Sequence, residues 1–346
     1  MRLVGLLIAL VITSVSVMPL SCGAANPDTD GAGKTVDIAA LKYDATLSEF
    51  PYPYAVEHFA FDSQGQSLDM GYMYLPSAAN KPVVVLMHGK NFNGAYWQST
   101  AEHLHAQGYG VLIPDQIGFG KSSKPVDYQY SFSALASHTK ALMASLDIEK
   151  GIILGHSMGG MLASRFALLY PESTSKLLLI NPIGLENYLL YSQYKDVDFF
   201  YQQEQKKSAE SIQAYQQKNY YAGQWDQQYA NLTYFMIGQV QGPDSDSIAK
   251  VNALTYDMIF TQPVIEEFEY ISVPTRLIIG TRDRTAPGRN WQKVGNTHEL
   301  GRYDLLGKQV IKQFKDAKLY ELADLGHLPQ IEDFSRFKIV LDKALH

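Results

Sequence analysis

Short runs of aliphatic residues recur along the chain and alternate with segments of helical periodicity. The runs in the first half are "KPVVVLMHG" (81–89), "YGVLIPD" (109–115), "GIILG" (151–155) and "SKLLLINP" (175–182). Short continuous apolar runs of this kind are typical of strands buried on both faces of a sheet. Helical patterns lie between them, at 95–108, 131–148 and 158–171. Strands that alternate with helices predict an α/β fold, with a mostly parallel central sheet and helices on both faces.

Further strands are expected on both sides of this region. Residues 54–76 form two alternating segments around the turn "DSQGQS", which predicts a pair of strands. Two more apolar runs, "VPTRLIIGTRD" (273–283) and "AKLYELADLGH" (317–327), predict the last strands of the sheet.

The regular alternation stops between residues 184 and 269. This stretch is rich in Tyr and Gln, has no clear strand pattern and begins directly after a predicted strand. Functional insertions in open α/β sheets lie at the carboxyl edge of the strands, over the ligand crevice. We therefore interpret 184–269 as a helical cap and 55–183 with 270–346 as the core. A purely structural helical appendage is the alternative.

The N-terminus has the composition of an export signal. Arg2 precedes an apolar run from Leu3 to Met18, and small residues follow. The run is shorter than the ~20 residues that span a bilayer, so residues 1–24 are interpreted as a signal and the protein as periplasmic or secreted. Cys22, at the end of the run, resembles a lipoprotein attachment site and leaves a lipid anchor as an open alternative. Residues 25–54 are polar and irregular and are expected to form a leader across the surface.

Composition places the chain among soluble globular enzymes. Of its 346 residues, 46% are hydrophobic and 18% are charged, and the formal net charge is −6. No basic run exceeds two residues, which argues against a nucleic-acid partner. The single cysteine excludes an intramolecular disulfide.

Candidate chemistry begins at "GHSMGG" (155–160), where Ser157 stands between glycines as a predicted strand turns into a predicted helix. A serine hydroxyl is a weak nucleophile unless a base accepts its proton. The tight turn projects the hydroxyl, and the amides and dipole at the start of the helix can stabilise a developing oxyanion. An ordinary glycine-rich turn between strand and helix is the alternative for this motif alone.

Other chemistry-bearing segments also follow predicted strands. They are "HGKNFNG" (88–94), "DQIGFGKS" (115–122), "GTRDRTAP" (280–287) and "LGHLPQIED" (325–333). The chain order Ser157, Asp283, His327 resembles that of the α/β-hydrolase superfamily, and most closely that of capped, HG-type serine esterases, over about residues 55–346. The resemblance implies Ser157 as nucleophile, His327 as base and Asp283 as the acid that orients the histidine. It also implies an oxyanion hole formed by the amides of Met158 and Lys90.

Several residues compete for these roles. Glu186 is the alternative acid, because it follows the strand that ends at Asn181, where some relatives carry theirs. His156 adjoins Ser157, but its side chain is expected to point away on a sharp turn. His88 and Asp115 are interpreted as structural residues of their loops. His298 and His103 are expected to be surface or helix residues.

The resemblance implies a serine hydrolase that acts through an acyl-enzyme on carboxylic esters, with no cofactor and no metal. A serine nucleophile argues against relatives that use Asp, such as haloalkane dehalogenases and epoxide hydrolases. Hydrolysis of carbon–carbon bonds in aromatic ring-cleavage products and cofactor-free perhydrolysis remain alternatives, as does a binding protein with an idle triad. The tyrosines of the cap favour small or aromatic, moderately polar esters.

Overall fold

The computed structural model describes residues 36–78 and 81–346. The export signal expected at 1–24, its Cys22 and the first residues of the leader lie outside this part of the chain. No helix within the described residues is long and apolar enough to cross a membrane.

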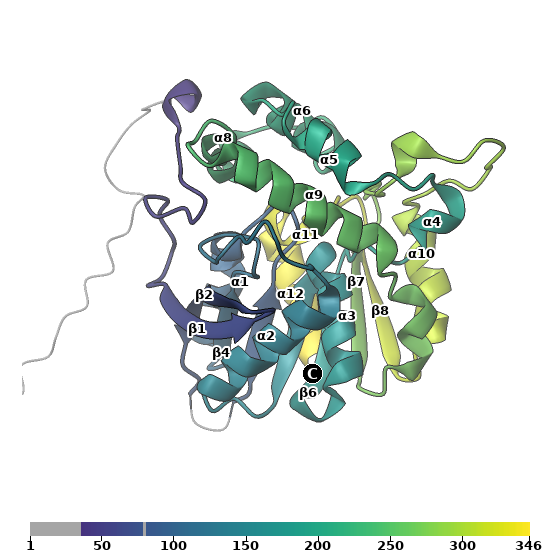
Figure 1. Ribbon diagram of the computed structural model, residues 1–346. Coiled ribbons are helices and arrows are strands. Elements are labelled where there is room, and N and C mark those ends of the chain that lie inside the picture. Colours follow the sequence, from purple (N-terminus) through teal and green to yellow (C-terminus); the bar gives the residue numbers. More distant parts are fainter. Residues whose placement is uncertain (1–35, 79–80) are drawn as a thin grey trace, which may run out of the picture. The chain divides into compact units, whose positions relative to one another are not determined.

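An eight-stranded sheet forms the centre of the fold and confirms the α/β class (Figure 1). Its strands are β1 (Glu57–Ser63), β2 (Gln66–Leu75), β3 (Val83–Met87), β4 (Gly110–Pro114), β5 (Gly151–His156), β6 (Thr174–Ile180), β7 (Thr275–Gly280) and β8 (Ala317–Leu322). Their order is β1-β2-β4-β3-β5-β6-β7-β8. β2 pairs antiparallel with β1 and β4, and every other pairing is parallel. The carboxyl ends of the parallel strands therefore meet at one edge of the sheet.

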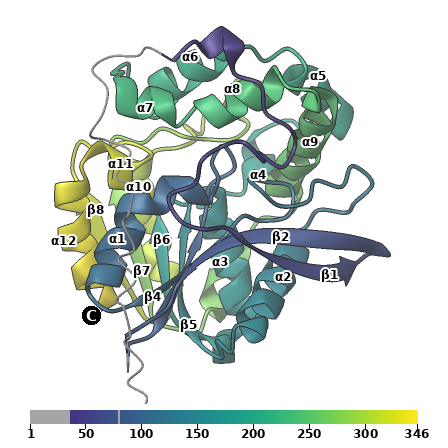
Figure 2. The same ribbon diagram turned by 90° about the vertical axis from the view of Figure 1, so that its left-hand side faces the viewer.

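Helices cover both faces of this sheet. The helices of the core are α1 (Gln98–Ala106), α2 (Phe132–Ser145), α3 (Met158–Leu169), α10 (Tyr303–Val310), α11 (Pro329–Glu332) and α12 (Phe334–Leu345). α2 and α3 lie on one face, and α1 and α12 lie on the other (Figure 2). The apolar run of β3 explains this sandwich, because its side chains alternate between the two buried clusters: Val85 and Met87 pack on one face, Val84 and Leu86 on the other.

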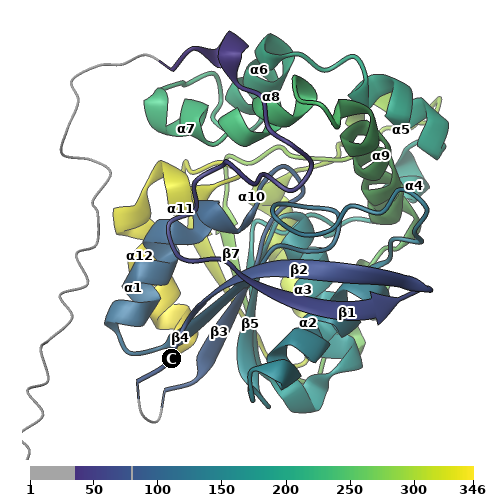
Figure 3. The same ribbon diagram turned by 60° about the vertical axis from the view of Figure 1, so that its left-hand side comes forward.

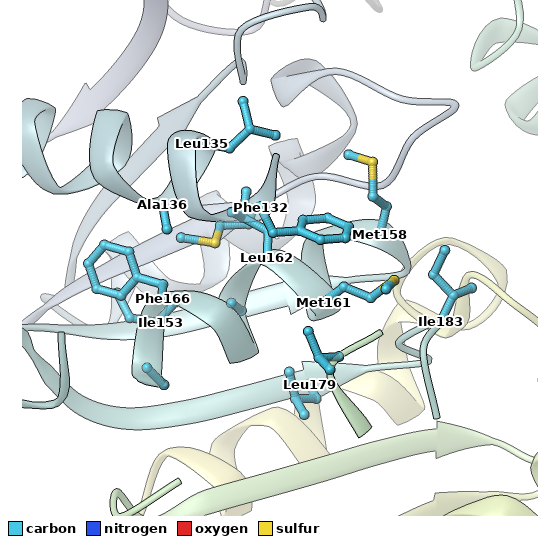
Figure 4. Packing of buried hydrophobic residues seen from close by; sticks show 14 of the residues in the cluster. Phe132, Leu135, Ala136, Ile153, Met158, Met161, Leu162, Phe166, Leu179 and Ile183 are labelled. Atoms are coloured by element: carbon cyan, nitrogen blue, oxygen red, sulfur yellow. The ribbon is translucent and has the colours of Figure 1, made fainter. Parts of the chain in front are cut away.

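The core under the serine turn is densely packed. Met158, Leu162 and Phe166 of α3 contact the same buried cluster as side chains of α2, β5 and β6 (Figure 4). All three are fully buried, at 0% exposure. Since close-packed interiors resist small displacements, this cluster gives α3 and the turn before it a rigid base.

The segment between β6 and β7 is helical. Its helices are α4 (Tyr188–Tyr191), α5 (Val197–Glu204), α6 (Ala209–Asn219), α7 (Gln227–Asn231), α8 (Tyr234–Val240) and α9 (Ser245–Thr261). They gather beyond the carboxyl edge of the sheet, with α9 nearest to it (Figure 1). α9 buries Val251, Met258 and Phe260 in the cluster that also holds α2 and α3. We refer to residues 184–269 as the cap.

The described part of the leader is tied to both cap and core. We call residues 38–52 the strap; its path from the cap towards β1 is visible in Figure 3. Tyr43 N donates to Gly238 O of α8 at 2.9 Å. At the other end, Tyr52 Oη donates to a carboxylate oxygen of Asp115 at 2.6 Å. Leu47, between them, is completely buried. The strap is thus packed more deeply than a polar leader lying on the surface.

Candidate active site

Ser157 occupies the tight turn between β5 and α3. Its φ of 58° and ψ of −122° lie outside the regions that ordinary residues prefer. Such local strain persists only where the surrounding structure holds it, and it is concentrated at functional sites. The residue is 7% exposed, so its hydroxyl lies in a largely enclosed space.

The flanking glycines are required because backbone segments approach each other closely here. A Cβ at Gly155 would lie 2.0 Å from the carbonyl oxygen of Gly159. A Cβ at Gly159 would lie 2.1 Å from the carbonyl oxygen of Met87 at the end of β3. Any side chain at either position would force α3 away from the sheet and displace the serine.

The fold brings Ser157, His327 and Asp283 into one hydrogen-bonded chain, although 170 residues separate the first two. His327 Nδ1 lies 2.7 Å from Asp283 Oδ2, and His327 Nε2 lies 2.9 Å from Ser157 Oγ. An ionised carboxylate only accepts, so Nδ1 carries the proton in this pair. Nε2 of a neutral imidazole is then free to accept the hydroxyl proton of Ser157.

Asn181 fixes the orientation of Asp283, a function that sequence reasoning missed. Its Oδ1 accepts from Gly280 N at 2.7 Å, which turns its amide nitrogen towards Asp283 Oδ2 at 2.9 Å. The other carboxylate oxygen, Oδ1, accepts from Thr285 N at 2.7 Å. Charged hydrogen bonds of this kind hold a carboxylate in one rotamer. The sequence does contain a signal for this function: an Asn stands directly after β6, which is the strand next to the one that carries the acid.

The arginines beside Asp283 have other partners. Arg282 forms an ion pair with Glu332. Arg284 lies 3.3 Å from Asp304, and its guanidinium also donates to the backbone carbonyl of Asp283 at 2.6 Å. The carboxylate of Asp283 is therefore oriented by Asn181 and a backbone amide.

The loop after β3 adjoins the serine, at the place expected for the oxyanion hole. A Cβ on Gly89 would lie 3.1 Å from Ser157 Cβ, and the next residue along the loop is Lys90. Met158 is the first residue of α3, and the first amides of a helix have no acceptor within it. Both predicted donors thus stand beside Ser157, and their amide roles remain a prediction.

His156 does not belong to the triad of Ser157, His327 and Asp283. It supports two neighbouring loops, the one after β3 and the one that carries His327. Its Nε2 donates to the backbone carbonyl of His327 at 2.8 Å, and Tyr96 Oη lies 3.0 Å from its Nδ1. Tyr96 Oη in turn accepts from Gly89 N at 3.2 Å. Burial lowers the pKa of His156 well below its usual value, and the neighbouring His327 adds to this effect. A neutral His156 can donate through Nε2 while it accepts at Nδ1.

His88 and Asp115 form hydrogen bonds with the backbone of the neighbouring loops, as expected for structural residues. His88 Nε2 accepts from Gln116 N at 3.1 Å, which leaves Nδ1 to donate to Gly89 O at 2.9 Å. Burial lowers the pKa of His88 and favours its neutral form. The Asp115 carboxylate accepts from the amides of Gly94 and Lys121, at 2.6 and 2.7 Å, as well as from the strap.

The remaining candidates lie away from the triad's hydrogen bonds. Glu186 is buried and accepts from His298 Nε2 at 2.6 Å and from Gly301 N at 2.9 Å. His103 Nε2 contacts Asp342 of α12 at 2.7 Å. In the structure the acid that contacts His327 is Asp283 and not Glu186.

A pocket of about 400 Å³ opens beside Ser157 between core and cap. Its apolar and aromatic lining residues include Ile183, Phe200, Tyr215, Tyr220, Tyr256 and Trp291. The ring of Tyr220 stacks on that of His327 with 4.7 Å between centroids, and its hydroxyl accepts from Asn91 Nδ2 at 2.9 Å. Polar and charged side chains complete the lining, and a pocket with both aromatic walls and polar groups suits a small organic molecule. The described residues contain no group of three or more His, Cys, Asp or Glu that could hold a metal ion.

Comparison with known proteins agrees with this architecture. A family model described as alpha/beta hydrolase fold matches residues 82–334. The crystal structure of a probable hydrolytic enzyme from Pseudomonas aeruginosa PAO1 is 44% identical in sequence and superimposes with a TM-score of 0.86. That alignment covers 89% of this chain and 99% of the other.

Curated relatives match over shorter stretches. A 2-hydroxy-6-oxo-6-phenylhexa-2,4-dienoate hydrolase of Burkholderia cepacia is 35% identical over 116 residues, which are 33% of this chain and 41% of that protein. A fluoroacetate dehalogenase of a Burkholderia species is 37% identical over 123 residues, which are 34% and 38% of the two chains. The match therefore spans less than half of the length of each of these relatives.

Proposed function

Since the chain belongs to the α/β-hydrolase fold family, we propose that it is a serine hydrolase that cleaves carboxylic esters of small or aromatic substrates through an acyl-enzyme. The observation that carries this proposal is the hydrogen-bonded chain from Ser157 through His327 to Asp283, placed at the wall of a pocket.

In the proposed reaction, Ser157 Oγ attacks the ester carbonyl while His327 Nε2 accepts its proton. Asp283 stabilises the imidazolium that forms, and the amides of Met158 and Lys90 stabilise the oxyanion. His327 then gives its proton to the leaving alcohol, which leaves the acyl group on Ser157. Water, deprotonated by His327, attacks the acyl carbonyl. The bond between the acyl carbon and Ser157 Oγ then breaks, His327 returns its proton to Oγ, and the carboxylic acid is released. Tyr220, stacked on His327, shields the imidazole from bulk water.

Replacing the nucleophile tests this proposal directly. We expect Ser157→Ala to lower the turnover of p-nitrophenyl acetate and butyrate by about 10⁴–10⁶-fold, since triad members act as a unit. Labelling with a fluorophosphonate should add one phosphonyl group, located on Ser157 by peptide mass spectrometry. Ser145→Ala, on the exposed side of α2, is the matched control and should retain full activity. A folded Ser157→Ala protein with more than a few per cent of wild-type activity would refute the assignment.

Carbon–carbon hydrolysis is the second candidate, favoured by the similarity to the phenylhexadienoate hydrolase. The same triad could serve both reactions, so the substrate decides between them. Purified protein should be assayed on p-nitrophenyl esters of increasing acyl length and on a vinylogous 1,5-diketone. If kcat/KM for the diketone exceeds that for every ester, carbon–carbon hydrolysis is the better assignment.

A further inference from the structure

The pocket beside Ser157 carries a set of charged side chains that the triad chemistry does not use. Three lysines and one glutamate line it: Lys90, Lys206, Lys207 and Glu204. The whole chain has a formal net charge of −6, so this positive lining is a local feature. Clefts lined by one sign of charge concentrate ligands of the opposite sign.

Lys90 differs from Lys207 in having no counter-ion. Lys207 Nζ lies 2.7 Å from Glu204 Oε2, and the side chain of Glu204 is only 7% exposed. In residues 36–78 and 81–346, no carboxylate oxygen lies within 4.0 Å of Lys90 Nζ. Lys90 Nζ instead donates to Asn252 Oδ1 at 3.3 Å and lies 5.3 Å from the centre of the Tyr256 ring. A desolvated ammonium without a counter-ion is costly, and a bound anion would remove that cost.

A smaller cavity of about 30 Å³ adjoins the pocket and extends its positive character. Lys90, Lys124 and Lys207 all contribute to its lining. The ammonium of Lys124 is already satisfied, because it donates to the carbonyl oxygens of Gly120 and Ser122 at 2.6 and 3.0 Å. Lys90 and Lys207 line both cavities, while Lys206, the third lysine of the pocket, is exposed to solvent. Since Lys207 pairs with Glu204, Lys90 is the lysine of these two whose ammonium has no carboxylate partner among the described residues and keeps donors for a ligand.

We propose that the ammonium of Lys90 binds a carboxylate of the substrate, so that the preferred substrates are esters carrying a negative charge. This inference rests on the proposed function, since it concerns the same pocket. The backbone of Lys90 follows Gly89, which lies against Ser157, while its side chain reaches Asn252 and Tyr256 of α9. An ester carbonyl at Ser157 and a carboxylate at Lys90 Nζ can therefore belong to one small molecule.

Two pairs of matched esters measure this preference. In the first pair the charge is on the acyl side: mono-p-nitrophenyl glutarate against p-nitrophenyl pentanoate. In the second it is on the alcohol side: 4-acetoxybenzoate against 4-acetoxybenzamide. The readout is the ratio of kcat/KM for the anionic ester to that for its neutral partner. We expect the wild-type ratio to exceed one for at least one pair.

Substitution of Lys90 should abolish that preference. We expect Lys90→Met to lower the ratio by about 10–100-fold, the usual effect of losing a charged hydrogen bond, and Lys90→Arg to retain most of it. Lys308→Met is the matched control, because Lys308 lies on α10, 61% exposed and paired with Glu321. If folded Lys90→Met keeps the wild-type ratio in both pairs, or wild type prefers the neutral ester in both, the inference is wrong. Ser157-dependent turnover of the neutral esters tests the proposed function separately.

The pH dependence of the wild-type ratio gives a second test that needs no variant. The pKa of Lys90 is lowered to about 7, mainly by desolvation, with Glu204 opposing the shift and Lys207 contributing to it. The tyrosines that face it, Tyr220 and Tyr256, have pKa values raised well above 10 by burial and stay neutral. The preference for the anionic ester should therefore be larger at pH 6 than at pH 9. Since both esters use the same triad, its titration cancels in the ratio. A ratio that rises with pH would contradict the inference.

Discussion

At the scale of single residues, the choice between Asp283 and Glu186 decides how the triad works. Asp283 Oδ2 accepts a hydrogen bond from His327 Nδ1, and Asn181 fixes that oxygen in place. We expect Asp283→Asn to keep the shape of the site but to favour the wrong imidazole tautomer, which lowers kcat by roughly 10⁴-fold. Steady-state kinetics on p-nitrophenyl acetate, with melting temperatures measured alongside, would check this.

Glu186 provides the matched control for Asp283. It is buried like Asp283, but its carboxylate accepts hydrogen bonds from His298 and from Gly301 N. Glu186→Gln should lower the melting temperature more than it lowers kcat, because it weakens hydrogen bonds of the loop at residues 298–301. A triad-like loss of kcat in Glu186→Gln, with Asp283→Asn nearly fully active, would place the acid after β6 instead.

At the scale of elements, the strap contacts both the cap and the core, and we expect it to stabilise their attachment. Leu47 is 0% exposed, and the carbonyl of the same residue accepts from Lys121 Nζ at 2.5 Å. We expect Leu47→Ala to lower the free energy of unfolding by about 2–4 kcal/mol, as is usual for truncation of a buried leucine. Because the strap also bonds to α8, limited proteolysis should cut the cap of this variant faster than that of wild type.

The control for this prediction is Leu190→Ala in the cap, where the leucine is 58% exposed. Its unfolding free energy should change by no more than about 0.5 kcal/mol. Equal stability of Leu47→Ala and Leu190→Ala in urea unfolding would show that the strap lies on the molecule without holding it together.

At the scale of the whole molecule, buried neutral histidines make the fold sensitive to acid. Burial lowers the pKa of His138 to about 4, and it also lowers the pKa values of His88 and His156. The unfolded chain takes up protons near pH 6.5, where these folded groups do not. The contribution of these histidines to the free energy of unfolding is therefore fully present above pH 6.5. It is lost as the pH drops below that value, by up to about 1.4 kcal/mol per pH unit for each histidine.

Melting temperatures at pH 7.5, 6.0 and 5.0 should show this decline. His138→Gln should reduce its slope between pH 6.5 and 4, because the variant has no proton to take up at that position. His105→Gln, on the exposed side of α1, is the control and should leave the slope as it is in wild type. A wild-type melting temperature that is constant from pH 7.5 to 5.0 would contradict the prediction.

The sequence by itself determined the α/β class, because short apolar runs and helical periods are local patterns that each segment carries within itself. The strands around 81–89 and 151–155 and the helical character of 184–269 could be predicted in this way. The tight turn at Ser157 could also be predicted from the sequence, since only glycine tolerates the close backbone approach at positions 155 and 159.

Only the tertiary structure decided which distant side chains meet. Asn181 and Asp283 are 102 residues apart, and their contact depends on the adjacent, parallel placement of β6 and β7. The strap looked like a polar leader because its buried and aromatic residues, Leu47 and Phe50 among them, are scattered without a period, and its hydrogen bonds often use backbone atoms, which leave no pattern in the sequence. The sequence pointed to the backbone amide of Lys90 and gave no role to its side chain. Its lack of a counter-ion follows from the position of α9 and from the pairing of Glu204 with Lys207, and packing between segments far apart in the chain determines both.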